Sequence, residues 1–190
     1  MKIYKIGIIG CGGIAQKMAA TLEKMKGVER YAVASRNQEK AEAFANKWGF
    51  TKAYGSYEEL ASDPEVDLIY IATPHAMHYD NAHMCIEKGK PVLCEKAFTA
   101  NARQAEDLLA FAKEKGVFIT EAIWTRYMPL SLKIQELLKE GVIGTPYTLS
   151  ANLSYPISNK ERIIRPELAG GALLDIGVYT LNFAVNGFRK

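Results

Sequence analysis

The stretch Ile6-Gly7-Ile8-Ile9-Gly10-Cys11-Gly12-Gly13-Ile14-Ala15 decides the fold of this chain. An apolar run typical of a buried strand leads directly into a glycine-rich loop, and a helical pattern begins at Ile14. In the spacing Gly10-x-Gly12-x-x-Ala15, the first glycine allows a tight turn and the second lets a pyrophosphate approach the backbone. The helix N-terminus adds positive potential. This pattern predicts a dinucleotide site at Gly10, Gly12, Gly13 and Ile14; the alternative is a structural glycine turn.

The alternation of short apolar runs with helical patterns continues to about residue 120. Runs that are apolar on both faces, separated by helices, are typical of a parallel sheet covered by helices on both sides. We therefore predict an α/β fold, a doubly wound parallel-sheet Rossmann domain over residues 1–122. The expected strands cover 3–9, 30–34, 51–54, 68–72, 91–94 and 117–120. The expected helices cover 14–26, 38–48, a short segment from 56, a segment ending at 88, and 101–115.

The pattern changes in residues 123–190. A helix is expected over 129–140 and another within 170–186, while residues 147–155 alternate strictly between apolar and polar side chains. This alternation predicts a strand with one polar face, as in an open antiparallel sheet. Because one strand is not stable alone, we expect the beginning of an incomplete, truncated α+β open-sheet domain.

Composition and charge argue against several classes of function. A net charge of +3 over 190 residues, with no basic run, argues against a nucleic-acid partner, and no apolar run has the length of a membrane span. Cys11, Cys85 and Cys94 are odd in number and lack metal-binding spacing, which indicates reduced thiols and a cytoplasmic location. The three histidines, His75, His78 and His83, have no partners that complete a tetrahedral site, so no metal is expected.

The end of the second expected strand bears on the choice of cofactor. An NAD site usually has an acidic residue there for the ribose 2′-hydroxyl. This chain has Ser35-Arg36 instead, which can donate a hydrogen bond and a charge-assisted contact to a 2′-phosphate. The sequence therefore predicts NADP(H), with NAD(H) as the second choice. The alternative is that Arg36 is simply a solvated loop residue.

Two further segments carry residues with catalytic chemistry. Lys96 follows an expected strand at the carboxyl edge of the sheet, where it can stabilise the alkoxide of a reacting hydroxyl. Asp175 and Tyr179 are four residues apart in an expected helix, so they share a face and can form a proton-handling pair. Alternatively, Lys96 is solvated, Asp175 interacts with the helix dipole and Tyr179 packs in a core. Spacing alone favours these structural alternatives.

Four groups of residues together resemble the motifs of a known family: the glycine loop, Ile71-Ala72-Thr73-Pro74 with His78, Val92-Leu93-Cys94-Glu95-Lys96, and Gly170-Gly171 through Tyr179. The chain is similar to the glucose–fructose oxidoreductase / inositol dehydrogenase / rhizopine catabolism (Gfo/Idh/MocA) family over essentially its whole length. A further segment, 121–127, together with Tyr179 where most of the family has His, resembles the branch of trans-1,2-dihydrobenzene-1,2-diol and NADP-dependent D-xylose dehydrogenases.

The resemblance implies roles for single residues. Lys96 and Tyr179 would be the acid/base pair, Asp175 would orient them and the substrate, and Trp124 would line the substrate pocket with Asp175 and Tyr179. It also implies that the second domain, which begins at residue 123, binds the substrate and forms a homo-oligomer through its open sheet. Ala97 departs from the family, which usually has Pro after the Glu-Lys pair. The remaining cofactor contacts that it implies are Thr73, Pro74, His78, Glu95 and Lys96.

The expected function is that of an NADP-dependent oxidoreductase. A hydride would pass between nicotinamide and a secondary alcohol or hemiacetal of a sugar or cyclic diol. The alternative is a truncated cofactor-binding or NADPH-sensing protein without turnover, which the early end of the chain relative to the family favours.

Overall fold

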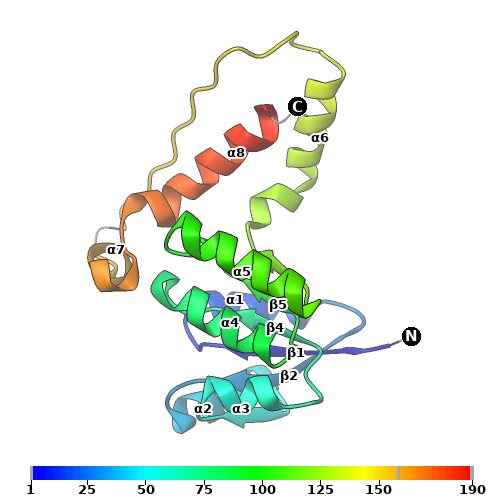
Figure 1. The fold of residues 1–190 in the computed structure, drawn as a ribbon, viewed down its shortest axis with the longest axis vertical. Coiled ribbons are helices and arrows are strands. Elements are labelled where there is room, and N and C mark those ends of the chain that lie inside the picture. The colour runs from blue at the N-terminus through cyan, green and yellow to red at the C-terminus, as the bar shows by residue number, and fades with distance from the viewer. Residues whose placement is uncertain (1, 158, 189–190) are drawn as a thin grey trace. The chain divides into compact units, whose positions relative to one another are not determined.

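Six parallel strands form one sheet in the N-terminal part of the chain (Figure 1). The structure, a computed structural model, describes residues 2–157 and 159–188. The chain divides into two compact units, Met1–Glu121 and Ala122–Lys190, and each is described by itself.

The sheet of the first unit has the strand order β3-β2-β1-β4-β5-β6, and all neighbouring strands are parallel. The order reverses between β1 and β4, and in such sheets a ligand crevice lies beyond the carboxyl ends of the strands at this point. The doubly wound sheet predicted from the sequence is therefore confirmed. The strands are β1 (Tyr4–Ile9), β2 (Val28–Ala34), β3 (Lys52–Tyr54), β4 (Leu68–Ile71), β5 (Val92–Cys94) and β6 (Ile119–Glu121).

Helices connect these strands, and side-chain caps fix where several of them begin. The side-chain oxygens of Asn37 and Asn101 accept N–H bonds from Lys40 and Gln104, at 2.8 and 3.0 Å. Helix α1 ends at Leu22, earlier than the predicted end at residue 26. The helices are α1 (Gly13–Leu22), α2 (Gln38–Trp48), α3 (Tyr57–Ser62), α4 (His78–Glu87) after the 3₁₀ turn η1 (His75–Met77), and α5 (Ala102–Lys115).

The core of the first unit lies between the sheet and its helices. Side chains of β1, β2, β4 and β5 pack with residues of α3, α4 and α5 in one continuous cluster. Burial of this apolar surface is the main source of stability, at roughly 25 cal/mol per Å². The least exposed members include Ile9, Leu60, Ile69, Ile71, Ile86, Val92 and Leu108.

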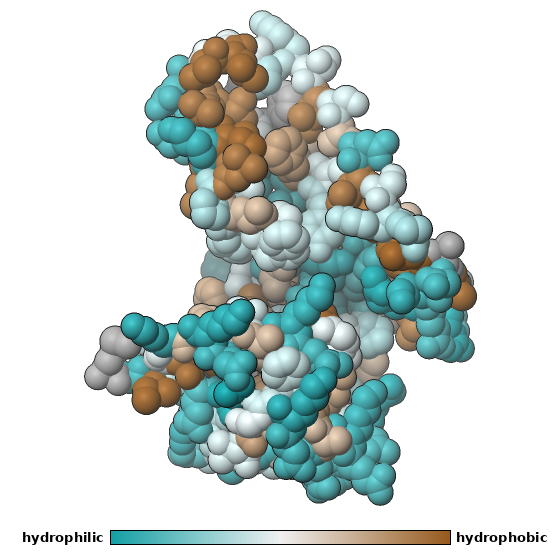
Figure 2. All heavy atoms as spheres, turned by 180° about the vertical axis from the view of Figure 1, so that it is seen from behind, coloured by the Kyte–Doolittle hydropathy of each residue, from teal (hydrophilic) through white to brown (hydrophobic). Residues whose placement is uncertain are grey.

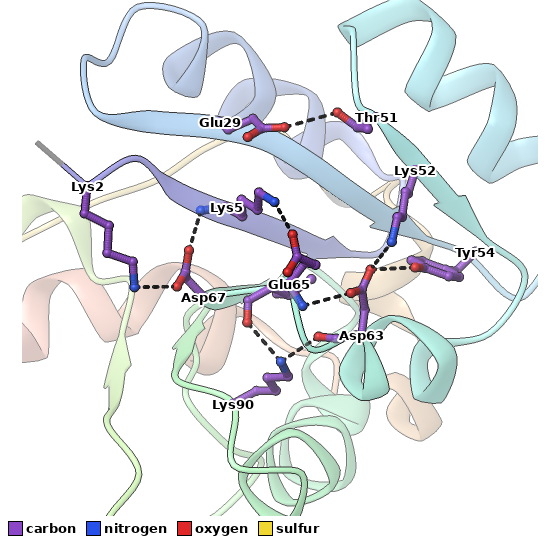
Figure 3. Close-up of polar contacts among 11 residues, drawn as sticks. Lys2, Lys5, Glu29, Thr51, Lys52, Tyr54, Asp63, Glu65, Asp67 and Lys90 are labelled. Carbon is purple, nitrogen blue, oxygen red and sulfur yellow. Dashed lines mark hydrogen bonds and ion pairs between the residues drawn. The ribbon is translucent and has the colours of Figure 1, made fainter.

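Charged side chains gather at the amino edge of the sheet (Figure 3). The side chain of Asp63, which precedes β4, is only 3% exposed. It accepts hydrogen bonds from Lys52 Nζ at 2.9 Å, the Tyr54 hydroxyl at 2.6 Å and the Glu65 N–H at 2.9 Å. Lys90 Nζ donates to the backbone oxygen of Asp63 at 2.6 Å. The Asp63 carboxylate thus joins β3 to the loop that leads into β4.

The second unit contains helices and no strand among its described residues. Its elements are η2 (Trp124–Tyr127), α6 (Pro129–Lys139), α7 (Glu161–Ile164), η3 (Pro166–Leu168), a π-helical turn η4 (Leu173–Gly177) and α8 (Val178–Phe188). In Figure 1 an extended segment connects α6 to α7. A cavity of about 410 Å³ is lined by α6, this segment and α8.

The strand predicted over Tyr147–Tyr155 is not formed, and this prediction was wrong. These residues are extended but belong to no sheet, and the backbone bond between Ile157 N–H and the Tyr155 oxygen, 2.9 Å long, is a local turn. A strand needs the backbone of a neighbouring strand for its hydrogen bonds. The described residues of the second unit provide no such neighbour, so the alternating pattern remains without a sheet.

Large apolar side chains are exposed in the second unit, and Figure 2 shows several at its surface. Of residues 122–157 and 159–187, only Ile123 and Asp175 are buried. The exposed apolar side chains include Leu130, Leu132, Val142, Ile143, Tyr147, Leu173, Leu181 and Phe183.

One stretch, Pro166–Gly187, is long and apolar enough to cross a membrane, by length and composition alone. No apolar run of this length was expected from the sequence, and by length and composition this stretch is an exception. The stretch is not a continuous helix, because Ala169 and Gly171 have φ values of +54° and +121°. It also contains the buried carboxylate of Asp175. Length and composition are weak indications of a membrane span in this case.

The Asp63 carboxylate makes the stability of the first unit depend on pH. Burial would raise its pKa, but the bonds from Tyr54, Lys52 and Glu65 outweigh burial and lower the pKa to about 2 from the ordinary 3.8. A group with a lowered folded-state pKa stabilises the protein above its unfolded-state pKa and loses this effect as the pH falls through the folded value. The contribution is therefore complete above about pH 4 and disappears toward pH 2.

We expect Asp63→Asn to lower the free energy of unfolding at pH 7 by about 2–3 kcal/mol, because it leaves Lys52 without its buried partner. Denaturant unfolding between pH 2 and pH 7 measures this. The difference between the two proteins should shrink as the pH approaches 2. Glu114→Gln, which removes an exposed carboxylate from α5, is the control and should have little effect. A pH-independent difference would contradict the role given to the Asp63 charge.

Candidate active site

The loop between β1 and α1 has the geometry of a phosphate site. Gly10 has φ +101°, and a Cβ at this position would lie 2.8 Å from the Ala72 backbone oxygen, so a side chain is excluded. Around Gly12 and Gly13 a Cβ would meet no atom within 4 Å. Helix α1 has no side-chain cap at Gly12, and its first N–H groups lack helical acceptors. Open space at an uncapped helix N-terminus fits a pyrophosphate.

The end of β2 brings cationic and polar groups to the same edge of the sheet. Ser35 is buried, whereas Arg36 is exposed. Arg36 lies beside Tyr57: burial raises the pKa of the Tyr57 phenol, and the Arg36 charge opposes this rise. Burial likewise raises the pKa of the Cys11 thiol, against the nearby charge of Lys40. Two cations, Arg36 and Lys40, therefore lie around the end of β2 near the glycine loop.

The loop after β4 is held by a buried polar network. Asn81 Nδ2 donates to Thr73 Oγ1 at 3.1 Å. The fully buried ring of His78 lies between two backbone oxygens, with Nε2 2.9 Å from Thr73 O and Nδ1 2.7 Å from Ala97 O. Burial lowers the pKa of His78, and these two contacts oppose the shift. The neutral ring has a single N–H and donates to one of these two oxygens, so His78 lies between the loops that follow β4 and β5 and is bonded to one of them. The expected contact of His78 with the cofactor stays a prediction.

Glu95 and Lys96 follow β5 at the carboxyl edge of the sheet. The buried Glu95 carboxylate accepts a hydrogen bond from the Tyr70 hydroxyl in β4 and another from the Lys96 N–H at 3.2 Å. Burial raises the pKa of Glu95, and both bonds oppose this. The peptide bond between Lys96 and Ala97 is cis. Thr73, Pro74, Glu95 and Lys96 thus all follow the neighbouring strands β4 and β5.

The remaining expected residues lie in the second unit. Trp124 Nε1 donates to the Tyr179 hydroxyl at 3.2 Å, and the two rings meet edge to face, with centroids 6.2 Å apart. Asp175 is buried in the π-helical turn η4, and Arg162 Nη2 lies 3.0 Å from its Oδ2. The structure therefore brings Trp124 and Tyr179 together, and it gives Asp175 a cationic partner from α7.

Several residues of this region were missed by the sequence analysis. Lys40 lies in the first turn of α2, only four residues after Arg36, and this short distance along the sequence was a usable signal. Tyr70 is hidden in the apolar pattern of β4, and Arg162 has no pattern that links it to Asp175. Across residues 2–157 and 159–188, no three His, Cys, Asp or Glu side chains gather where they could hold a metal ion.

Comparisons with known proteins agree with the fold of the first unit. Residues 4–122 match the model of the GFO/IDH/MocA oxidoreductase family, described as an NAD-binding Rossmann fold. Residues 131–189 match the GFO/IDH/MocA C-terminal domain. The chain is 44% identical over 201 residues to D-xylose 1-dehydrogenase (NADP(+)) of Hypocrea jecorina, covering 94% of this chain and 51% of that protein. It is 40% identical over 187 residues to trans-1,2-dihydrobenzene-1,2-diol dehydrogenase of Xenopus tropicalis, covering 97% and 57%.

The solved structures include a similar enzyme with a bound cofactor. KijD10, a 3-ketoreductase from Actinomadura kijaniata in complex with TDP-benzene and NADP, is 31% identical with a TM-score of 0.86, and the match covers 98% of this chain and 57% of that one. The chain thus spans about half the length of the relatives that it matches. By the family match over residues 4–122, the order of its parallel sheet and the glycine loop at the N-terminus of α1, the chain belongs to the GFO/IDH/MocA family of oxidoreductases.

Proposed function

We propose that this chain is part of an NADP-dependent oxidoreductase acting on a secondary alcohol or hemiacetal of a sugar or cyclic diol. The observation that carries the proposal is the joint position of the glycine loop and two cations, Arg36 and Lys40, at the carboxyl edge of one sheet. The loop is suited to a pyrophosphate, and the cations are suited to a 2′-phosphate. The relatives named D-xylose 1-dehydrogenase (NADP(+)) and trans-1,2-dihydrobenzene-1,2-diol dehydrogenase support the substrate class.

In this proposal the first unit holds the cofactor. The backbone N–H groups at Gly12, Gly13 and Ile14 bind the pyrophosphate, and Ser35, Arg36 and Lys40 bind the 2′-phosphate. The nicotinamide, when bound, exchanges a hydride with the substrate carbon.

In the proposal, Lys96 and Tyr179 manage the proton of the reacting hydroxyl. The Lys96 ammonium donates a hydrogen bond to the substrate oxygen and stabilises the alkoxide that forms on oxidation. Tyr179 takes up or delivers the proton, and Asp175, held by Arg162, orients the substrate. The Tyr70–Glu95 pair keeps the loop of Lys96 in place.

The homo-oligomer and the cytoplasmic location remain predictions, as do the absence of nucleic-acid and membrane partners. We propose a second copy of the chain as the partner of the apolar face of residues 147–155, because Tyr147, Leu149 and Tyr155 are exposed. Sedimentation over a range of concentrations is expected to show self-association of the 190-residue chain. A monomer at high concentration, with no hydrophobic surface that binds a reporter dye, would contradict this.

The first prediction of the proposed function concerns the cofactor. NADPH should bind more tightly than NADH, and Arg36→Ala should reduce this preference by one to two orders of magnitude, or about 1.5–3 kcal/mol for a charge-assisted contact. Lys40→Met should have a smaller effect of the same sign. Fluorescence titration with both nucleotides measures the affinities. Arg103→Ala, an exposed arginine on α5, is the matched control. Equal affinities for the two nucleotides would sink the assignment of NADP.

The second prediction concerns the proton. In the active protein, Lys96→Met and Tyr179→Phe should each lower turnover by about 10²–10⁴-fold and change NADPH affinity little, since neither side chain is assigned to the phosphates. Asp175→Asn should have a smaller effect. The double variant Lys96→Met/Tyr179→Phe should be little worse than the worse single one.

Steady-state kinetics together with nucleotide titration separate the outcomes. Lys113→Met, an exposed lysine of α5, is the control for loss of a positive charge. Near-normal turnover in Tyr179→Phe would mean that Tyr179 has only a packing role. Loss of nucleotide binding in Lys96→Met would mean that Lys96 holds the cofactor and does not act on the proton. Nucleotide binding with no turnover in the unaltered protein would favour a sensing function.

A further inference from the structure

Trp124 contacts Tyr179 through a polar bond as well as through its ring. The indole Nε1 lies 3.2 Å from the Tyr179 hydroxyl oxygen, and the two rings meet at an interplanar angle of 69°. Both residues belong to the second unit. A residue that merely lines a substrate pocket would not need a hydrogen bond to the phenol.

The chemistry of the two groups fixes the direction of this bond. An indole N–H can only donate, so the phenol oxygen must be the acceptor. The single hydrogen of the Tyr179 hydroxyl therefore cannot point at Trp124 and must point toward a different acceptor. We propose that Trp124 is a positioning residue for Tyr179: its indole N–H occupies one side of the phenol oxygen and directs the hydroxyl proton toward the substrate oxygen. This inference rests on the proposed role of Tyr179 in proton transfer.

The indole is held in place by its own neighbourhood. The backbone N–H of Trp124 donates to the backbone oxygen of Ala122 at 2.9 Å, where the chain leaves β6 and enters η2. Two residues further along η2, Arg126 donates from Nε and Nη2 to Asn182 Oδ1, at 3.1 and 2.5 Å. Asn182 lies three residues after Tyr179 in α8, on the same helix face. Two side-chain contacts, one turn apart on α8, thus fix η2 along this helix.

The effect should be smaller than that of losing the phenol itself. The Trp124 side chain is 57% exposed, so water can replace part of the donor function when the indole N–H is removed. We expect kcat to fall by about tenfold, while KM for the substrate changes by less than about twofold, because the phenol remains but its proton is no longer directed. A pocket-wall role would instead raise KM with little change in kcat.

The test uses the active protein and removes only the N–H. The benzothiophene analogue of tryptophan, in which sulfur replaces the indole N–H, is placed at position 124 and keeps the ring contact with Tyr179. Trp124→Phe removes both the donor and part of the ring. Trp48→Phe, whose Nε1 has no hydrogen-bond partner in the structure, is the matched control and should keep kcat and KM unchanged.

The inference predicts the kcat loss in the benzothiophene protein, with a solvent isotope effect larger than in the unaltered protein because proton transfer becomes slower. It also predicts that the benzothiophene substitution has no further effect on kcat when Tyr179 is already Phe. Unchanged kcat in the benzothiophene protein, or a change confined to KM, would overturn it. Normal turnover in Tyr179→Phe alone would instead overturn the proposed proton role of Tyr179, so the two failures are distinguishable.

Discussion

The close approach of Gly10 to the backbone oxygen of Ala72 is the constraint on which the site depends. A side-chain carbon at position 10 would lie 2.8 Å from that oxygen, well inside contact distance, and the residue has a φ of +101° that few side chains tolerate. The end of β1 can therefore lie against the start of the loop after β4 only with glycine here. This places the N-terminus of α1 at the reversal of strand order, where parallel sheets bind their ligands.

Around this contact, buried polar side chains hold the loops that carry the chemistry. His78 lies between the Thr73 and Ala97 oxygens, and Tyr70 supports the Glu95 carboxylate from the neighbouring strand. Each of these groups has a partner, which matters because an unpaired buried polar group costs about 1–3 kcal/mol. The same bonds that satisfy these groups define where the loop containing Lys96 lies. Stability and the position of the functional loop are thus provided by one set of contacts.

Features that depend on residues close together in the sequence could be predicted, whereas features that depend on distant residues could not. The strands and helices of the first unit were predictable because apolar periodicity, Asn37 and Asn101 caps and terminal glycines such as Gly49 act over a few residues. The alternation of residues 147–155 was equally clear, yet no strand formed, because pairing depends on a neighbouring strand that local sequence cannot supply. The Arg162–Asp175 and Trp124–Tyr179 contacts join distant positions, so no local pattern indicated them.

The cluster around Asp63 lies at the amino edge of the sheet, whereas the glycine loop, Arg36 and Lys96 lie at its carboxyl edge. Asp63 and Lys90 precede β4 and β5, so the length of these strands separates them from the glycine loop and Lys96. Tyr54 is the exception, because it is the last residue of β3 and its backbone oxygen accepts the Ser35 N–H at 3.1 Å. Substitutions at the amino edge can therefore change the thermal stability of the fold without replacing any residue at the ligand-binding edge. For protein engineering, this makes Asp63 and its lysine partners a region in which robustness can be adjusted independently of cofactor preference.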